Sequence, residues 1–98
     1  MKELINSFNR EFESRIRLGI MSILMVNDQA EFKTLKELLE LTDGNLASHL
    51  AALEKAHYIK VKKQFINRKP NTSYRASKEG RKAFAEHLKL LEKFLKKQ

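Results

Sequence analysis

Residues 34–56 read TLKELLELTDGNLASHLAALEKA and predict two short helices joined by a tight turn. Thr34 and Glu37 have the spacing of a capping box, which predicts that the first helix begins at Thr34. Thr42 is a good N-cap residue for the second helix, and Gly44 belongs to the predicted turn. A helix pair joined by a Gly-containing turn is typical of a helix-turn-helix motif, which we place at about residues 34–56.

The second helix of this pair has one apolar face and one small polar face. Leu46, Leu50 and Leu53 recur at helical spacing, which predicts that their face is buried. The opposite face carries Gly44, Asn45, Ser48, Ala51, Ala52 and Lys55, with His49 on its flank. Because few long charged side chains stand on that face, we expect it to lie close against another surface.

A two-stranded ribbon is predicted after the helix pair, at about residues 58–76. Residues 58–66 alternate between polar and apolar, which predicts a half-buried strand, although Lys63 interrupts the pattern. Residues 67–71 are interpreted as a turn because Pro70 is disfavoured in strand centres. The second strand is predicted at residues 73–76.

Long helices are predicted at both ends of the chain, at about residues 3–26 and 78–97. Apolar residues recur every four positions in the first segment, at Leu4, Phe8, Phe12, Ile16, Ile20 and Leu24. The last helix begins after Ser77 and has an apolar stripe at Phe84, Leu88, Leu91 and Leu95. The predicted fold class is therefore α+β, mainly α-helical with a small β-ribbon.

Positive charge is concentrated in one part of the chain. The net charge is +8, but residues 1–54 carry −3, residues 55–82 carry +9 and residues 83–98 carry +2. A localised basic zone is the footprint of a surface that binds a polyanion, although a solvated basic surface is the alternative interpretation.

Composition excludes several functional classes. The chain has 98 residues, which predicts one domain (residues 1–98), and it has no cysteine for disulfides, thiolate metal sites or nucleophiles. His49, His57 and His87 do not have metal-ligand spacing, and no catalytic constellation is visible. We therefore expect no enzyme activity, no metal and no cofactor. No apolar run approaches the roughly 20 residues that cross a bilayer, and no signal peptide is apparent, so a cytoplasmic, nucleoid-associated protein is expected.

The order of these segments resembles the winged helix-turn-helix regulators of the MarR and ArsR type. The resemblance spans about residues 15–90 and rests on residues 32–39, 41–50 and 53–59. It continues through the ribbon, with Phe65, residues 68–70, Thr72 and Tyr74, and ends with residues 77–81, which are similar to the Thr-x-x-Gly that opens the helix after the wing. Family members often have Gly where this chain has His57, so a left-handed backbone is expected there.

The resemblance implies that residues 42–56 form a recognition helix that enters the DNA major groove. Its candidate contacts are Thr42, Gly44, Asn45, Ser48, His49 and Ala52. The wing is implied to reach phosphates or the minor groove with Arg68 and Lys69 at its tip. The full set of candidate wing contacts is Lys62, Lys63, Arg68, Lys69, Asn71, Thr72 and Arg75.

The terminal helices are implied to pair with those of a second subunit. Their apolar stripes are also broader than a chain of this size can cover, so we expect them to be shared between the core and a homodimer interface. The candidate interface residues are Leu4, Ile5, Phe8, Phe12, Leu88, Leu91, Phe94 and Leu95.

The function that follows is sequence-specific binding of double-stranded DNA by a dimeric transcriptional regulator, with repression as the expected outcome. The alternative is a winged-helix module for protein–protein or RNA binding without operator recognition. The charge map favours a nucleic acid, because a protein-binding module does not need +9 concentrated in residues 55–82, the segment that contains the ribbon. The operator, the regulated genes and any small-molecule effector stay open.

Overall fold

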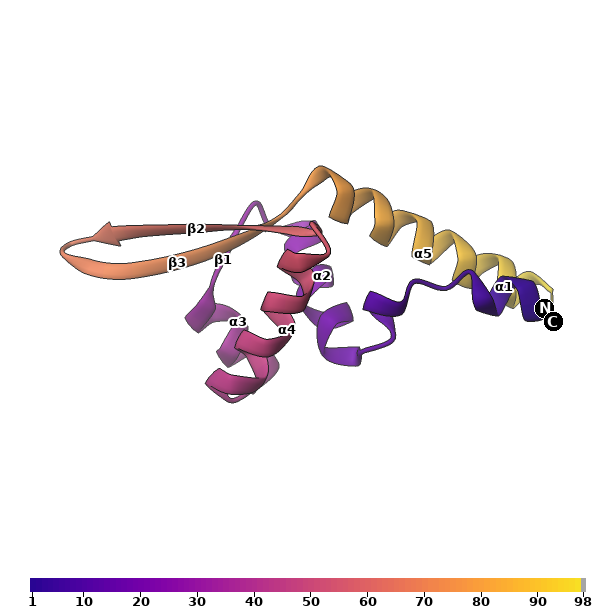
Figure 1. Ribbon diagram of the computed structural model, residues 1–98, viewed down its shortest axis with the longest axis horizontal. Coiled ribbons are helices and arrows are strands. Elements are labelled where there is room, and N and C mark those ends of the chain that lie inside the picture. The colour runs from indigo at the N-terminus through magenta and orange to yellow at the C-terminus, as the bar shows by residue number, and fades with distance from the viewer. Residues whose placement is uncertain (98) are drawn as a thin grey trace.

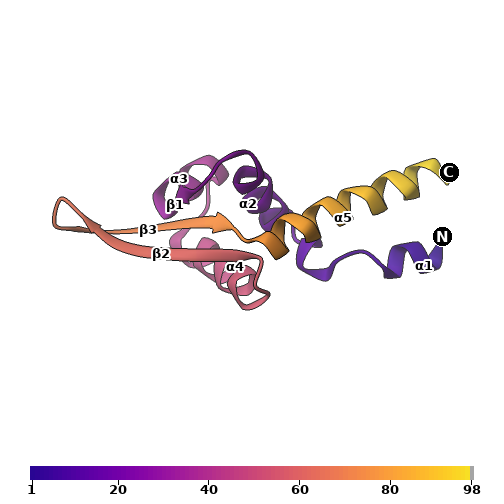
Figure 2. The ribbon, with the colours of Figure 1, turned by 90° about the horizontal axis from the view of Figure 1, so that it is seen from above.

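The computed structural model describes residues 1–97. The chain forms a helical body with two projections, and the molecule measures 54 × 25 × 21 Å along its principal axes. A β-hairpin leaves the body on one side, and a long C-terminal helix leaves it on the other (Figure 1). Figure 2 shows the same two projections from above. The elements are α1 (Lys2–Asn6), the 3-10 helix η1 (Arg10–Phe12), α2 (Arg15–Val26), β1 (Ala30–Glu31), α3 (Phe32–Leu39), α4 (Asp43–Lys55), β2 (Ile59–Ile66), β3 (Lys69–Ala76) and α5 (Lys78–Lys96).

This architecture confirms the predicted α+β winged-helix fold. The sheet is antiparallel with the strand order β1-β3-β2, so the predicted two-stranded ribbon gains a short third strand. Ala30 and Glu31 of β1 pair with Tyr74 and Ser73 of β3. This short pairing attaches the base of the hairpin to the segment between α2 and α3.

The hairpin turn is tighter than predicted. We expected a turn over residues 67–71 and a strand from residue 73, whereas β3 begins at Lys69 and only Asn67 and Arg68 form the turn. Their φ angles are 52° and 66°, the left-handed values that a two-residue type I′ hairpin turn requires at both positions.

Pro70 is accommodated within β3 because of its register. It pairs with Phe65, one position beyond the Ile66–Lys69 pair that closes the turn. Antiparallel pairs alternate between hydrogen-bonded and non-hydrogen-bonded, and the pair that closes a two-residue turn is hydrogen-bonded. Pro70 therefore occupies a non-hydrogen-bonded position, where the missing N–H costs nothing.

One apolar core lies between the helices and one face of the sheet. Its buried side chains come from η1, from α2, α3 and α4, from the base of the hairpin and from the start of α5. They include Phe12, Ile20, Met21, Leu24, Leu35, Leu46, Leu50, Leu53, Ile59 and Phe84. The predicted apolar face of the second helix of the pair is thereby confirmed.

The start of the first helix of the pair and the position of the turn differ from the prediction. The first helix, α3, begins at Phe32 with Glu31 as its N-cap, so Thr34 lies inside it rather than capping it. The helix ends at Glu40, which has a left-handed φ of 51°, and the N–H of Leu41 donates to the carbonyl of Lys36. This Schellman-type ending, rather than the segment around Gly44, makes the turn.

The second helix, α4, begins as predicted. Thr42 is its N-cap, and the Thr42 hydroxyl accepts a hydrogen bond from the N–H of Asn45 at 3.2 Å. At the other end His57 has a φ of 64°, which confirms the expected left-handed residue. The N–H groups of His57 and Tyr58 donate to the carbonyls of Glu54 and Leu53, which completes a Schellman motif.

The predicted continuous helix over residues 3–26 is wrong. The segment divides into α1, η1 and α2 because polar side chains cap new starts. Asn9 accepts from the N–H of Glu11, and Ser14 accepts from the N–H of Arg17. Asn and Ser side chains that accept hydrogen bonds from nearby backbone N–H groups are favoured at helix N-caps and disfavoured in helix interiors. They therefore end one helix and begin another, although the apolar spacing continues across the break.

The break turns the N-terminal segment along α5 of the same chain. Phe8 makes edge-on contacts with Phe94 and His87, and Phe12 packs against His87 and Phe84, with centroid distances of 5.3–5.9 Å. His87 is buried among these rings, and its Nδ1 has no hydrogen-bond partner within residues 1–97. Burial lowers the pKa of His87, which favours its neutral form.

Candidate nucleic-acid interface

The outward face of α4 is built by the burial of its leucines. Because Leu46, Leu50 and Leu53 face the core, the opposite side of the helix is left to solvent. The exposed residues on and beside this face are Thr42, Gly44, Asn45, Ala47, Ser48 and Ala51. Small side chains of this kind allow the helix axis to approach a partner surface closely.

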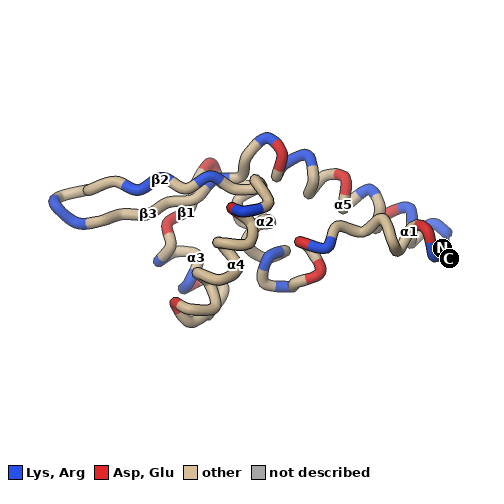
Figure 3. Tube along the Cα trace, viewed as in Figure 1, with Lys and Arg blue, Asp and Glu red and all other residues tan. Residues whose placement is uncertain are grey.

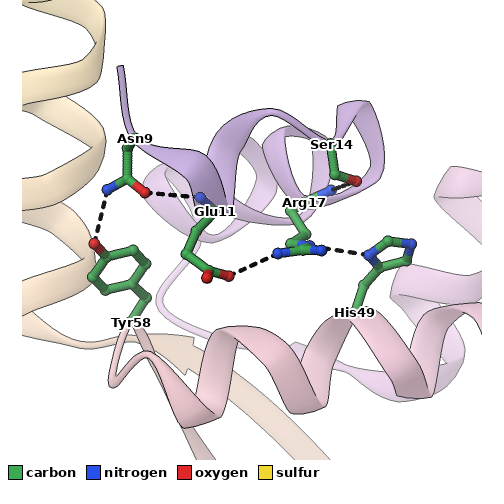
Figure 4. Close-up of polar contacts among 6 residues, drawn as sticks. All are labelled: Asn9, Glu11, Ser14, Arg17, His49 and Tyr58. Carbon is green, nitrogen blue, oxygen red and sulfur yellow. Dashed lines mark hydrogen bonds and ion pairs between the residues drawn. The ribbon is translucent and has the colours of Figure 1, made fainter. Parts of the chain in front are cut away.

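His49 is held by a neighbouring helix rather than standing free on α4. Its Nδ1 accepts a hydrogen bond from Nε of Arg17 at 3.2 Å, and Arg17 also forms an ion pair with Glu11 at 2.7 Å (Figure 4). In the same view Asn9 donates to the Tyr58 hydroxyl at 2.8 Å. These contacts fix α4 and the start of the hairpin against the N-terminal segment, so His49 has a positioning role that the sequence did not indicate.

Three alanines of α4 differ from the expected set of contact residues. Ala52, which we expected at the interface, is half-buried, whereas Ala47 and Ala51 are exposed. Helical spacing places Ala51 on the outward face, so its position was visible in the sequence. Ala47 carries no chemical signal, and only its exposure identifies it.

The hairpin has two faces, and pairing assigns each side chain to one of them. The face toward the helices carries Ile59, Val61 and Tyr74 at its base, and further out Lys63, Phe65, Pro70 and Thr72. The other face carries Lys60, Lys62, Gln64, Asn71, Ser73 and Arg75. Of the expected wing contacts, Lys63 and Thr72 therefore lie on the side of α4, whereas Lys62, Asn71 and Arg75 lie on the opposite side.

Lys63 interrupts the apolar alternation because the hairpin extends past the core at that point. Arg68 and Lys69 stand at the turn, where Figure 3 shows basic residues at the outermost point of the hairpin. Arg68 is held at a left-handed φ of 66° in a turn position where Gly is common. A non-glycine residue in that region is strained, and such strain is concentrated at functional sites.

Residues 16–95 match the family described as winged helix DNA-binding domain. The chain belongs to the winged-helix DNA-binding family. A protein from Methanocaldococcus jannaschii, described as uncharacterised, is 38% identical over 77 residues, which cover 79% of this chain and 84% of that protein.

Solved winged-helix structures share the whole arrangement. A transcriptional regulator homologue from Pyrococcus horikoshii has a TM-score of 0.85 and 30% identity, and the match covers 97% of this chain and 92% of that one. A PadR family transcriptional regulator from Eggerthella lenta shows the same fold at 18% identity, with a TM-score of 0.65 and coverage of 79% and 74%. The structural neighbours are ArsR-, MarR- and PadR-family regulators; the resemblance in the sequence implied the ArsR and MarR types and did not include PadR.

In this winged helix, α4 is the second helix of the helix pair and the β2–β3 hairpin is the wing. Glu79, the acidic residue within the basic segment 55–82, lies at the start of α5, away from the wing tip. Hydrogen bonding from its own backbone N–H lowers the pKa of Glu79, and Ser77 and Lys60 act in the same direction. Glu79 therefore offsets charge only at the base of the hairpin, near Lys60, and the basic tip of the wing has no acidic neighbour from within that segment.

The expected dimer residues separate into buried and exposed groups. Phe12 is 2% exposed and belongs to the core of its own chain, so its assignment to the interface is wrong. Leu4, Phe8 and Phe94 are half-buried, and Phe8 and Phe94 pack against each other within the chain. Ile5, Leu88, Leu91 and Leu95 stay exposed.

No group of three His, Asp or Glu side chains within residues 1–97 is placed to hold a metal ion. Over the same residues, no helix combines the length and the apolar character needed to span a bilayer.

Proposed function

We propose that this winged helix binds specific sites on double-stranded DNA as a homodimer and represses transcription by occupying them. The observation that carries the proposal is the exposed face of small and polar residues on α4, next to a projecting hairpin with a basic tip. A helix with this face fits the major groove, and a basic ribbon beside it fits the phosphate backbone.

The two elements have different roles in this proposal. Asn45 and Ser48 are exposed and have polar groups that can hydrogen-bond base edges, so they read sequence. Arg68 and Lys69 have long cationic side chains at the wing tip, so they contact phosphates. His49 supports α4 through Arg17 and leaves base contact to its neighbours.

The homodimer is proposed from an apolar stripe along α5. Leu88, Leu91 and Leu95 lie on the helix face that continues the line of buried Phe84, and they extend beyond the body. The adjacent face, with His87 and Phe94, is covered by Phe8 of the same chain. A two-fold pair through the free stripe is the usual closed solution, and it presents two recognition helices to half-sites about 34 Å apart.

Binding to duplex DNA is expected to weaken steeply as salt rises. The basic segment releases condensed counterions when it contacts phosphates. About six phosphate contacts per dimer correspond to a slope near −5 in a plot of log K against log salt. Titration of a labelled random duplex at several salt concentrations measures the slope, and duplex RNA serves as the competitor. A flat response, or stronger binding to RNA, would contradict the DNA proposal.

Variants of α4 and of the wing are expected to have different effects. Asn45→Ala or Ser48→Ala should cost about 1–3 kcal/mol on a selected site and little on random DNA. Arg68→Ala and Lys69→Ala should weaken both kinds of DNA alike and make the salt slope shallower. The measurement is binding to a duplex selected by the protein from a random pool, compared with a scrambled duplex. Equal losses on both duplexes for all four variants would show that Asn45 and Ser48 do not read bases.

A further inference from the structure

Phe65 is a large apolar side chain left in solvent on an otherwise polar hairpin. It is 76% exposed, and the residue paired with it across the hairpin is Pro70, which is also exposed. Neither residue contributes to the core, and the sequence pattern gave them no function beyond that of a strand and its turn. Burial of this apolar pair against a partner would be favourable, because it would remove both side chains from water.

The register places this pair on the same face of the wing as the helices. Val61 and Tyr74 face the body at the base of the hairpin, and Phe65 and Pro70 lie four positions further along the same face. At about 3.3 Å per residue, Phe65 stands roughly 13 Å beyond Val61. Along DNA, a major groove and the neighbouring minor groove are about 17 Å apart, which is half of a 34 Å helical turn. The projection of the wing is of this order. With α4 in a major groove, we therefore expect the end of the wing to reach the adjacent minor groove.

The charges around the pair select a polyanion. Lys63 lies on the same face, Arg68 is in the adjacent turn, and Lys69 follows the turn on the opposite face, paired with Ile66. No Asp or Glu occurs in the segment from Lys55 to Lys78. Apolar side chains with a cationic rim are the combination by which proteins wedge open a base step from the minor groove, because the cations hold the backbone while the apolar group replaces stacking.

We propose that Phe65, supported by Pro70, is a wedge that enters the minor groove beside the α4 site, partly unstacks one base step and kinks the duplex. The inference rests on the proposed DNA binding and extends it, because the bound site is then deformed and not only recognised. Side chains inserted in this way kink DNA by roughly 20–90° toward the major groove. Flexible pyrimidine–purine steps at the flanks of the site are therefore expected to be favoured, although α4 does not touch them.

The test measures bending and unstacking separately from affinity. The probe is a duplex of about 30 base pairs selected by the protein from a random pool, with donor and acceptor dyes at its ends and 2-aminopurine placed in turn at the flanking adenines. Wild-type protein is expected to raise energy transfer and 2-aminopurine fluorescence. Phe65→Ala should abolish both changes while affinity shifts by less than about tenfold, because lost burial and avoided unstacking nearly offset each other.

A matched control is available one residue away. Ile66 is also exposed and apolar, but it lies on the opposite face of the wing, so Ile66→Ala should keep both signals. Unchanged bending by Phe65→Ala, or equal loss in both variants, overturns the wedge while leaving DNA binding intact. A change in sedimentation mass caused by Phe65→Ala overturns it in favour of a contact between copies of the chain. Failure of wild-type protein to bind any duplex overturns the wedge and the proposed function together.

Discussion

Gly80→Ala is expected to lower the free energy of unfolding by about 3 kcal/mol, the upper end of the range for overpacking. A Cβ at Gly80 would lie 2.8 Å from the carbonyl carbon of Tyr58 and closer still to its oxygen. The obstacle is backbone, and it cannot rotate away. Tyr58 O is held by the N–H of Ser77, and the Ser77 hydroxyl both accepts from Gly80 N and donates to His57 O. A shift of α5 therefore also loses its N-terminal cap.

Gly44→Ala is the matched control for this variant. Gly44 lies in the first turn of α4, and a Cβ there would have no heavy atom within 4 Å. Because Ala favours helix over Gly, this variant should gain about 0.5–1 kcal/mol. Urea unfolding followed by circular dichroism, at one protomer concentration for all proteins, measures both. Equal midpoints for wild type and Gly80→Ala would show that α5 is not fixed by its close approach to Tyr58.

The double substitution Leu91→Asp with Leu95→Asp is expected to convert the proposed dimer to monomer. Fully burying one Leu contributes roughly 1.5–3 kcal/mol, and a two-fold interface loses every contact twice. Even with both side chains only partly buried in the dimer, the dissociation constant should rise more than about a hundredfold. Sedimentation equilibrium at micromolar concentration gives the mass, and binding to a two-half-site duplex should fall with it.

The control places the same acidic residues on the other side of α5. Lys82 and Lys89 are exposed and lie more than about 120° around the helix from the middle of the stripe, so Lys82→Asp with Lys89→Asp should stay dimeric. The stripe variant should keep its helical circular dichroism, because Leu91 and Leu95 are exposed within the chain. A monomeric wild type, or a stripe variant that still sediments as a dimer, would contradict the proposed interface.

The helix pair was largely predictable because its signals are local. Leu46, Leu50 and Leu53 are separated by one and two helical turns, and the Thr42 cap acts on a backbone N–H three residues away. The left-handed position at His57 was expected from the resemblance, because family members often have Gly there, and the Schellman motif that ends the helix explains it. None of these features depends on which distant segment packs against them.

The prediction for the N-terminal segment was wrong because the same apolar spacing fits both one continuous helix and a helix that is broken into shorter pieces. Phe8 and Phe12 have helical spacing, but Asn9 and Ser14 cap new starts and turn the chain along α5. Phe12 then enters the core, and Phe8 packs against Phe94. Spacing could not distinguish a long helix that binds a second subunit from a broken one that folds back on its own chain.

The winged-helix fold, the outward face of α4 and the basic character of the hairpin could be predicted from the sequence, because periodicity, caps and composition act within a few residues. Which apolar residues remain available to partners depends on what distant segments cover, so the three-dimensional arrangement was needed to identify them. In the folded chain Phe12 is buried and His49 is hydrogen-bonded to Arg17 of α2. Strand register leaves Phe65 in solvent. The Leu88–Leu91–Leu95 stripe stays exposed because the N-terminal segment covers only the adjacent face of α5.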